Sequence, residues 1–497
     1  GKISYDTKID TANNLTLAFK FESIRHLMLN DVVLTGDGLN SGYQHLIPLK
    51  GEVFNKKRFE ETLEKILDDY QKNGFPLAKI LIDSFAVDTL PELKITLFLN
   101  MISGNIANID GLKIIGNNIT SESVIIKQSG ISIGSKYKDE LFRNIPLRLM
   151  KLDIFESVRE PEFIMTNGKG LLKLELVELR SFAFDAVLGY VPSQNDDEEG
   201  YLTGLFNVGF RNLFGTARKF EIMWHRENRL NQVINLKYTE PFLFGMPVKT
   251  DIEFHQREQD YLYVSRNLRL GNSVIVGDDF TASIGLTYES VIPGYENAGS
   301  YFSKSKLYSA GFDLVYDTRN DLRFPVKGFL FQNTAEIGNK NYNSDLVKLK
   351  NKTIKKIGIK AEIINSFFSK QVLSNSVNAK LLFTDYFEQT DLVLFGGINS
   401  VRGYRDNQFA ATNVVWMNNE YKFYFGDNTS IYPFFDLAYY KLAATEDGLK
   451  EKEEFLYSYG IGMNVMSGIG IIRLNFSLGK NDKLSGMKVH LGFKNNF

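Results

Sequence analysis

The chain of 497 residues contains no cysteine, so neither a disulfide framework nor a thiolate metal site is possible. No run of about 18 apolar residues occurs, and no transmembrane helix is therefore predicted. The 58 Lys and Arg nearly balance the 59 Asp and Glu, which argues against nucleic-acid binding through a basic surface. Proline is scarce, at 11 residues, whereas Phe (39) and Tyr (24) are abundant. This composition leaves two classes open: a large soluble β protein and a membrane β-barrel.

The region from residue 181 to residue 497 shows alternation of apolar and polar residues. Ile472 and Leu474, for example, alternate with Arg473 and Asn475. A period of two over about nine to eleven residues predicts strands that cross a bilayer with one polar face. The predicted segments begin near Phe182, Tyr201, Arg218, Asn231, Val248, Tyr261, Thr281, Tyr308, Gly328, Ile354, Ser376, Val414, Ser430, Leu456, Ile471 and Met487. These are sixteen strands, and only a closed sheet leaves no backbone group unpaired in lipid.

A 16-stranded antiparallel transmembrane β-barrel is therefore predicted. The alternative is a soluble β-sandwich or propeller. It fits poorly, because Tyr421, Phe423 and Phe425 share the apolar face of their strand and no second sheet is predicted to bury them.

Residues 27–180 mix strands and helices and are interpreted as two copies of a small α+β domain, residues 27–104 and 105–180. The first copy has one predicted helix, Asn55–Asn73. The second has two, Thr120–Ser129 with Thr120 as N-cap, and Lys138–Asp153. The predicted strands are Val32–Leu34, Leu77–Ile82, Leu93–Leu99, Leu112–Ile115, Phe155–Arg159 and Leu171–Val177.

Residues 1–26 look like the end of a partial earlier copy, because Ile3–Ile9 and Leu15–Phe21 alternate as two strands. The partial copy predicts a longer parent protein, and the alternative is that residues 1–26 are only an N-terminal segment. The chain opens at Gly1 without a signal segment, so we expect a processed or artificially cut start.

The segment Ser400–Asp406, reading Ser-Val-Arg-Gly-Tyr-Arg-Asp, lies in a long connection after the eleventh predicted strand. The connection joins two strand-like segments, Val377–Phe387 and Val414–Phe425. An arginine on a tip that contains glycine predicts a loop that folds back to meet an acidic partner.

Two α+β repeats before sixteen strands, together with Val401-Arg402-Gly403-Tyr404, resemble the BamA/TamA superfamily of outer-membrane assembly and translocation proteins. Those proteins carry POTRA domains and a surface-antigen barrel. The resemblance extends from about residue 28 to the end. It includes a turn motif between the eighth and ninth strands, formed by Asp317, Arg319, Pro325 and Gly328.

The resemblance implies that Arg402 reaches into the lumen and pairs with Glu420 and Asp436. The alternation of side chains along the strand supports this for Glu420, because on the opposite face its carboxylate would lie in lipid. The resemblance also implies a lateral seam between the first and last strands. Its candidate residues are Phe182, Phe184, Gly189, Val489, Leu491, Gly492 and Phe497.

The function implied is assembly, insertion or translocation of proteins at the bacterial outer membrane, with the POTRA domains in the periplasm. Expected partners are the outer-membrane bilayer, unfolded β-barrel or secreted client proteins, and periplasmic chaperones or accessory lipoproteins. No nucleic acid, cofactor or metal is expected. Two alternatives stay open: a two-partner-type secretion pore, and the barrel carrier of a patatin-like lipase fusion whose enzyme domain is absent from these residues.

No catalytic residue is predicted. Gly130, Ser132 and Gly134 match the Gly-x-Ser-x-Gly pattern, but they lie between two predicted helices rather than between a strand and a helix. The five histidines lack metal-ligand spacing. Candidate client-binding edges in the α+β domains are Lys79–Ile82, Val32–Thr35 and Ile114–Gly116.

Overall fold

A computed structural model describes residues 2–9, 15–22, 27–36, 49–89, 92–191, 201–226, 230–259, 262–294, 303–322, 324–343, 350–425, 429–444, 450–467 and 470–494. The chain divides into two compact units. One comprises residues 1–115, 130–145 and 159–175, and the other comprises residues 116–129, 146–158 and 176–497. The predicted limits at residues 27, 105 and 181 stay predictions. No helix among the described residues is both long enough and apolar enough to span a bilayer.

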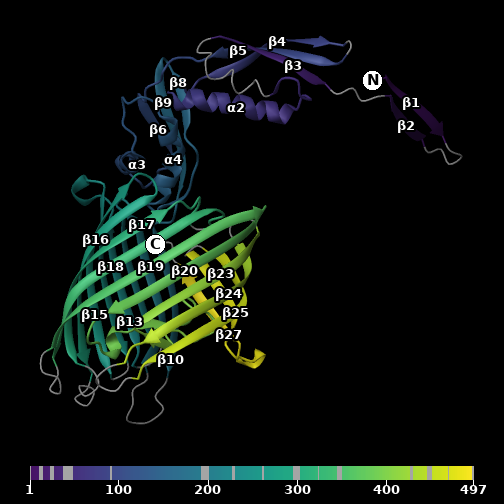
Figure 1. Cartoon of the computed structure of the whole chain (residues 1–497). Helices are drawn as coiled ribbons and strands as arrows, with labels where there is room; N and C mark the ends of the chain where they lie inside the picture. The colour runs from purple at the N-terminus through teal and green to yellow at the C-terminus, as the bar shows by residue number, and fades with distance from the viewer. Residues whose placement is uncertain are drawn as a thin grey trace. The chain divides into compact units, whose positions relative to one another are not determined.

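The first α+β copy contains β3 (Met28–Gly36), α2 (Lys56–Lys72), β4 (Lys79–Asp88) and β5 (Lys94–Ile102), and the hairpin of β1 (Lys2–Ile9) and β2 (Leu15–Glu22) precedes it (Figure 1). The sheet order is β3-β5-β4, with β3 parallel to β5. Asn55 caps α2 by accepting a hydrogen bond from the Arg58 N–H. The stripe Phe59, Ile66 and Tyr70 is buried against the sheet, as its 3.6-residue period predicts.

The second copy contains β6 (Gly111–Ile115), α3 (Glu122–Ser129), α4 (Asp139–Met150), β7 (Phe155–Val158), β8 (Glu162–Thr166) and β9 (Lys169–Glu178). Strand β9 is central: β6 pairs with it in parallel, and β7 and β8 pair with it antiparallel.

Three details of the second copy differ from the sequence interpretation. Strand β8 was missed, although Asn167 (φ 51°) and Gly168 (φ 76°) form the Asn-Gly turn that joins it to β9. Helix α4 ends at Met150 rather than Asp153. Thr120 lies before α3, which begins at Glu122, and its N–H donates to the Glu178 carboxylate at 2.7 Å instead of capping the helix.

A glycine ends the first strand of both copies in the same way. Gly36 (φ +113°) is so close to β5 that a Cβ would lie 2.0 Å from the Met101 carbonyl oxygen. Gly116 (φ +98°) follows β6, and a Cβ there would lie 1.9 Å from the Leu176 carbonyl oxygen. The shared close approach is structural support for the duplication.

The remaining strands form one antiparallel sheet. They are β10 (Phe182–Val191), β11 (Tyr201–Leu213), β12 (Arg218–Arg226), β13 (Gln232–Glu240), β14 (Val248–Gln259), β15 (Tyr263–Val276), β16 (Phe280–Pro293), β17 (Lys304–Asp317), β18 (Gly328–Asn343), β19 (Lys350–Phe368), β20 (Gln371–Phe383), β23 (Asn413–Phe425), β24 (Thr429–Leu442), β25 (Lys452–Ser467), β26 (Gly470–Gly479) and β27 (Lys488–Lys494). Each predicted segment overlaps one of these strands. Within the described residues the order ends at β10 and β27, which are not paired with each other, so closure of the sheet stays a prediction.

The sheet curves so that one face of each strand is enclosed (Figure 1). On β24, Tyr432, Phe434 and Asp436 are buried, whereas Ile431 and Phe435, at the alternate positions, are 39% and 44% exposed. This strand follows the period-two pattern closely. The strand before the long connection ends at Phe383, so the predicted extension to Phe387 is wrong, because Thr384–Phe387 already belong to the connection.

Alanine at the two equivalent glycines should destabilise the fold through steric overlap. Gly51 and Gly134 are matched controls, because both have positive φ (+78° and +88°) but nothing lies within 4 Å of an added Cβ. We expect Gly51→Ala and Gly134→Ala to cost about 1–2 kcal/mol for the backbone conformation alone. Gly36→Ala and Gly116→Ala should cost at least about 1–3 kcal/mol more. Hydrogen exchange of the β5 and β9 amides in the full chain measures this, and equal protection in all four variants would contradict it.

Candidate functional site: the lumen loop and the strand edges

The connection between β20 and β23 folds back against the inner wall of the large sheet. It contains a short hairpin of β21 (Val393–Phe395) and β22 (Phe409–Ala411), which the sequence did not reveal. The residues between these strands form the tip that carries Arg402. Ser400 fixes the tip through two hydrogen bonds. Its Oγ accepts from the Gly396 N–H at 2.7 Å, within the tip, and its carbonyl accepts from Asn418 Nδ2 of β23 at 2.7 Å.

Arg402 is buried, at 4% exposure, and its donors meet two carboxylates. Nε and Nη2 bind Asp436 Oδ2 and Oδ1 at 2.8 and 2.6 Å, and Nη1 binds Glu420 Oε1 at 2.5 Å. The Arg402 backbone N–H also donates to Asp436 Oδ2 at 3.0 Å. The structure thus brings together the arginine of β20–β23 and the two predicted acidic positions, one on β23 and one on β24.

Two neighbours complete the arginine site, and sequence reasoning did not single them out. Lys422 Nζ lies 2.9 Å from Glu420 Oε2, so two cations and two carboxylates balance. The Arg402 guanidinium carbon lies 3.7 Å from the centroid of the Phe434 ring, within range of a cation–π contact. The alternation of β23 and β24 places both residues on the inner face, but it does not tell which inner-face residues meet Arg402.

The tip also contacts the last strands of the sheet. A Cβ at Gly403 would lie 2.8 Å from the Leu478 carbonyl carbon on β26, so only glycine allows this approach. The Gly403 N–H points to His490 Nε2 on β27 at 3.4 Å. The Tyr404 hydroxyl donates to the Tyr457 carbonyl at 3.0 Å. Arg402 therefore ties β23 and β24 to a loop that rests on β25, β26 and β27.

A second ionic anchor holds the start of the same connection. Lys340 on β18 pairs with Asp391, and both side chains are only 1% exposed. The Tyr342 hydroxyl donates to the other Asp391 oxygen at 2.8 Å. No sequence motif pointed to this pair, because Lys340 and Asp391 are 51 residues apart and each looks like an ordinary polar residue.

The predicted turn motif lies between β17 and β18 and folds over the same enclosed space. Arg319 binds Asp317 with Nε and Nη2, both at 2.8 Å. Gly328 (φ +129°) begins β18, and the Pro325 carbonyl accepts from the Tyr424 hydroxyl of β23 at 3.2 Å.

The turn and the loop tip line one polar cavity of about 370 Å³. Arg319 and Pro325 line it from the turn, and Arg402, Glu420 and Lys422 line it from the loop and β23. Arg319 and Arg402 are 83 residues apart in the sequence, so it is the sheet that brings the two motifs to one cavity.

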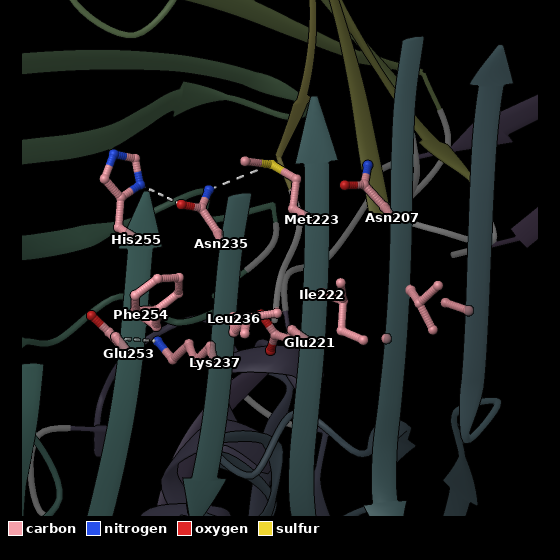
Figure 2. A pocket seen from close by; sticks show the side chains of 13 residues that line it. Asn207, Glu221, Ile222, Met223, Asn235, Leu236, Lys237, Glu253, Phe254 and His255 are labelled. Atoms are coloured by element: carbon pink, nitrogen blue, oxygen red, sulfur yellow. Dashed lines mark hydrogen bonds and ion pairs between the residues drawn. The ribbon is translucent and has the colours of Figure 1, made fainter. Parts of the chain in front are cut away.

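A second cavity, of about 360 Å³, lies along β10 to β14 and contains none of the predicted site residues (Figure 2). Glu221, Lys237 and Glu253 form a row across three strands there, with Lys237 Nζ 2.9 Å from Glu253. Asn235 binds His255 and Met223 in the neighbouring row (Figure 2). Alternating charges on facing strands stabilise the sheet, so this row has a structural explanation.

The predicted seam residues lie on the two end strands. On β10, Phe182 and Phe184 are 52% and 50% exposed, and on β27, Val489 and Leu491 are 57% and 62% exposed. The structure does not pair these strands with each other within the described residues. Gly189 faces Thr203 of β11, Gly492 lies under Ile398 of the loop, and Phe497 lies outside the described residues.

The remaining motifs have no chemical site around them. Gly130, Ser132 and Gly134 lie between α3 and α4, without the strand that a nucleophile elbow requires. Among the described residues no group of three or more His, Asp or Glu side chains is placed to hold a metal ion.

Removing the Arg402 side chain should release the loop tip. Arg402→Ala leaves Asp436 and Glu420 buried without their partner, a change that typically costs about 3–5 kcal/mol. Arg402→Lys should recover only part of the loss, because an ammonium cannot bridge both carboxylates. Hydrogen exchange of the tip amides measures the release. Arg405→Ala, an exposed site in the same tip, is the control, and equal exchange in the two Ala variants would refute the prediction.

The Lys340–Asp391 pair should show strong coupling. Lys340→Met or Asp391→Asn alone leaves a buried charge and should cost about 3–5 kcal/mol, whereas the double variant should cost clearly less than the sum. Urea unfolding in detergent micelles, followed by a double-mutant cycle, gives the coupling energy. Strict additivity would mean that the pair contributes no mutual stabilisation.

Comparison with known proteins supports the same fold. The family model described as the Omp85 superfamily domain matches residues 212–495. The solved structure of BamA from Haemophilus ducreyi lacking POTRA domains 1–3 is 15% identical, with a TM-score of 0.55 over 93% of this chain and 98% of that one. CdiB from Escherichia coli is 14% identical, with a TM-score of 0.55 over 94% of this chain and 90% of that one.

No curated protein sequence matches the chain significantly. The structural likenesses are at low identity and show the fold alone. The family match is independent of them and covers more than half of the chain. The protein therefore belongs to the Omp85 superfamily, whose members are outer-membrane β-barrel proteins.

Proposed function

We propose that this protein inserts or assembles β-barrel proteins in the bacterial outer membrane. In this proposal the large sheet closes as a 16-stranded barrel, the α+β copies are POTRA domains in the periplasm, and clients leave through a seam between β10 and β27. The protein is not an enzyme in this scheme, and the folding of the client supplies the free energy.

The observation that carries the proposal is the pair of free sheet edges. In the described residues, the backbone groups of β10 and those of β27 are not hydrogen-bonded to each other. An edge of this kind can template an incoming strand. Weak β-formers near the edge, such as Gly492, favour incomplete closure.

The strand lengths support a seam at which the bilayer opposes insertion of a client strand only weakly. Within the described residues the end strands β10 and β27 have 10 and 7 residues, whereas β18 and β19 have 16 and 19. At about 3.3 Å per residue, the described part of the wall beside the seam is about half as tall as the wall at β19. A short apolar wall thins the bilayer locally, and this would ease insertion of a client strand.

The lumen loop supports a coupling between the inner wall and the seam. Its tip is ionically bound to β23 and β24 and rests on β27 through Gly403 and Ile398. A movement of β27 would therefore shift the loop tip and disturb the ion pairs of Arg402. This is the basis for giving Arg402 a role in gating beyond that of an ion pair that closes the lumen.

The POTRA edges support client capture. Strand β4 is an edge of its sheet, and nearly all of its residues are exposed. Ile82 and Phe85 are 59% and 65% exposed, so an extended client could add a strand there and cover them. Strands β3 and β6, which contain the candidate edges expected from sequence, are also edges of their sheets. Periplasmic chaperones or accessory lipoproteins would deliver clients to these surfaces.

Depletion of the protein, followed by a census of outer-membrane barrels, tests the function. The expected result is a fall in many barrels at once. Unchanged levels of every barrel, with loss of a single secreted partner, would instead favour the two-partner-type secretion pore. Complementation with Arg402→Ala should fail although the variant barrel folds and reaches the membrane, and complementation with Arg405→Ala should succeed.

A cysteine pair across the seam tests the exit route. The chain has no native cysteine, so a disulfide between Phe184→Cys and Leu491→Cys would be unambiguous. Oxidation should stop client insertion, and a reductant should restore it. The control pair, Phe184→Cys with Val208→Cys, links β10 to the residue that faces Phe184 on its existing neighbour β11 and should leave activity intact. Full activity of the oxidised seam pair would exclude the proposed route.

A further inference from the structure

Two turns at one end of the large sheet carry the same tripeptide, Leu-Phe-Gly, with the phenylalanine fully outside the fold. Phe214 follows β11 and Phe244 follows β13, and each side chain is 90% exposed. No other large apolar side chain for which the structure gives an exposure reaches this value; Leu484, at 76%, comes next. Exposed apolar residues of this size at two equivalent positions indicate an interaction rather than chance.

The backbone makes the choice of phenylalanine more unusual. Phe214 has φ 56° and Phe244 has φ 52°, and each precedes a glycine with positive φ. Two consecutive positive φ values are typical of a tight hairpin turn whose first central residue is ordinarily Asn, Asp or Gly. A bulky residue there is a conformational outlier. Phenylalanine is therefore unfavourable at both positions for two reasons: the backbone conformation strains a bulky residue, and the ring would be exposed to water.

The surroundings of the two turns have the character of a lipid headgroup site. Ile119 and Met246, beside the first and second turn, are 51% and 50% exposed. Lys127 of α3 places its Nζ 5.7 Å from the Phe242 ring, and among the described residues it has no carboxylate partner. An apolar tip next to a free ammonium matches the boundary between acyl chains and phosphates.

The position of the turns selects the membrane as the occupant. Phe182, where β10 begins, pairs with Phe210 near the end of β11, so both turns lie at the end of the sheet at which its first strand starts. The outward face of β14 and β15 is apolar, with Ile252 and Leu268 43% and 47% exposed. The tips extend this wall beyond the ends of the strands, where the leaflet surface would lie.

We propose that Phe214 and Phe244 insert into the periplasmic leaflet as a paired lipid anchor beside the strands β11 to β14. This rests on the proposed function in that the sheet spans a membrane and that the α+β copies lie in the periplasm. The anchor fixes the depth at which this part of the wall sits, and Lys127 binds lipid phosphate. An accessory protein covering the same tips is the competing outcome of the test.

Tryptophan fluorescence in vesicles of dibrominated phosphatidylcholine tests the anchor. The two native tryptophans, Trp224 and Trp416, are first replaced by Phe. Phe214→Trp and Phe244→Trp are then compared with two references. Ile284→Trp reports the middle of the lipid-facing wall, because Ile284 is 62% exposed within β16. Leu484→Trp reports an exposed turn at the opposite end of the sheet. Folding of each variant is checked by its heat-modifiable electrophoretic mobility.

We expect bromolipid to quench Phe214→Trp and Phe244→Trp at least about twofold more than Leu484→Trp, and to quench Ile284→Trp as well. Quenching of Ile284→Trp without quenching of the two tips would overturn the anchor and leave the barrel in place, with the tips then open to a protein. Absence of quenching at Ile284→Trp would contradict the membrane barrel itself. The two failures are therefore distinguishable.

Discussion

Backbone hydrogen bonding between neighbouring antiparallel strands is the interaction on which the rest of this structure depends. It fixes which residues face the same side, because side chains alternate along every strand and stay in register between strands. Glu420 and Asp436 meet one arginine only because the paired strands β23 and β24 present both residues on the inner face. Among the described residues the same pairing ends at β10 and β27, the two strands between which the proposed function places a seam.

Buried ion pairs are the second feature that organises the molecule. A guanidinium or ammonium removed from water is stable only with partners that saturate its donors. The long connection uses this twice, at Arg402 with two carboxylates and at Lys340 with Asp391. Each pairing is specific to one position, so together they set the course of a connection that has little regular structure. The resulting loop lies against β25, β26 and β27, so a movement of the last strand would disturb the network.

The sequence predicted much of this organisation through periodicity. Each predicted segment of the large sheet overlaps a strand, and α2 begins one residue after the predicted start of its helix, Asn55. The misses have two physical causes. Strand β8 has five residues and the β21–β22 hairpin has three on each strand, which is too short for alternation to be recognised. Thr120 was taken as a cap because its local sequence suits one, but a distant carboxylate, Glu178, binds it instead.

By itself, the sequence determined the alternating strands, the helical stripes and the identity of the loop arginine with its two acidic candidates. These features are readable because they depend on neighbours along the chain or on parity within a strand. Only the tertiary structure decided that Lys422 and Phe434 complete the arginine site, that Lys340 anchors Asp391, and that the turn at Arg319 shares a cavity with the loop. The reason is physical: partners tens of residues apart meet through the curvature and register of the whole sheet, and no local pattern records that geometry.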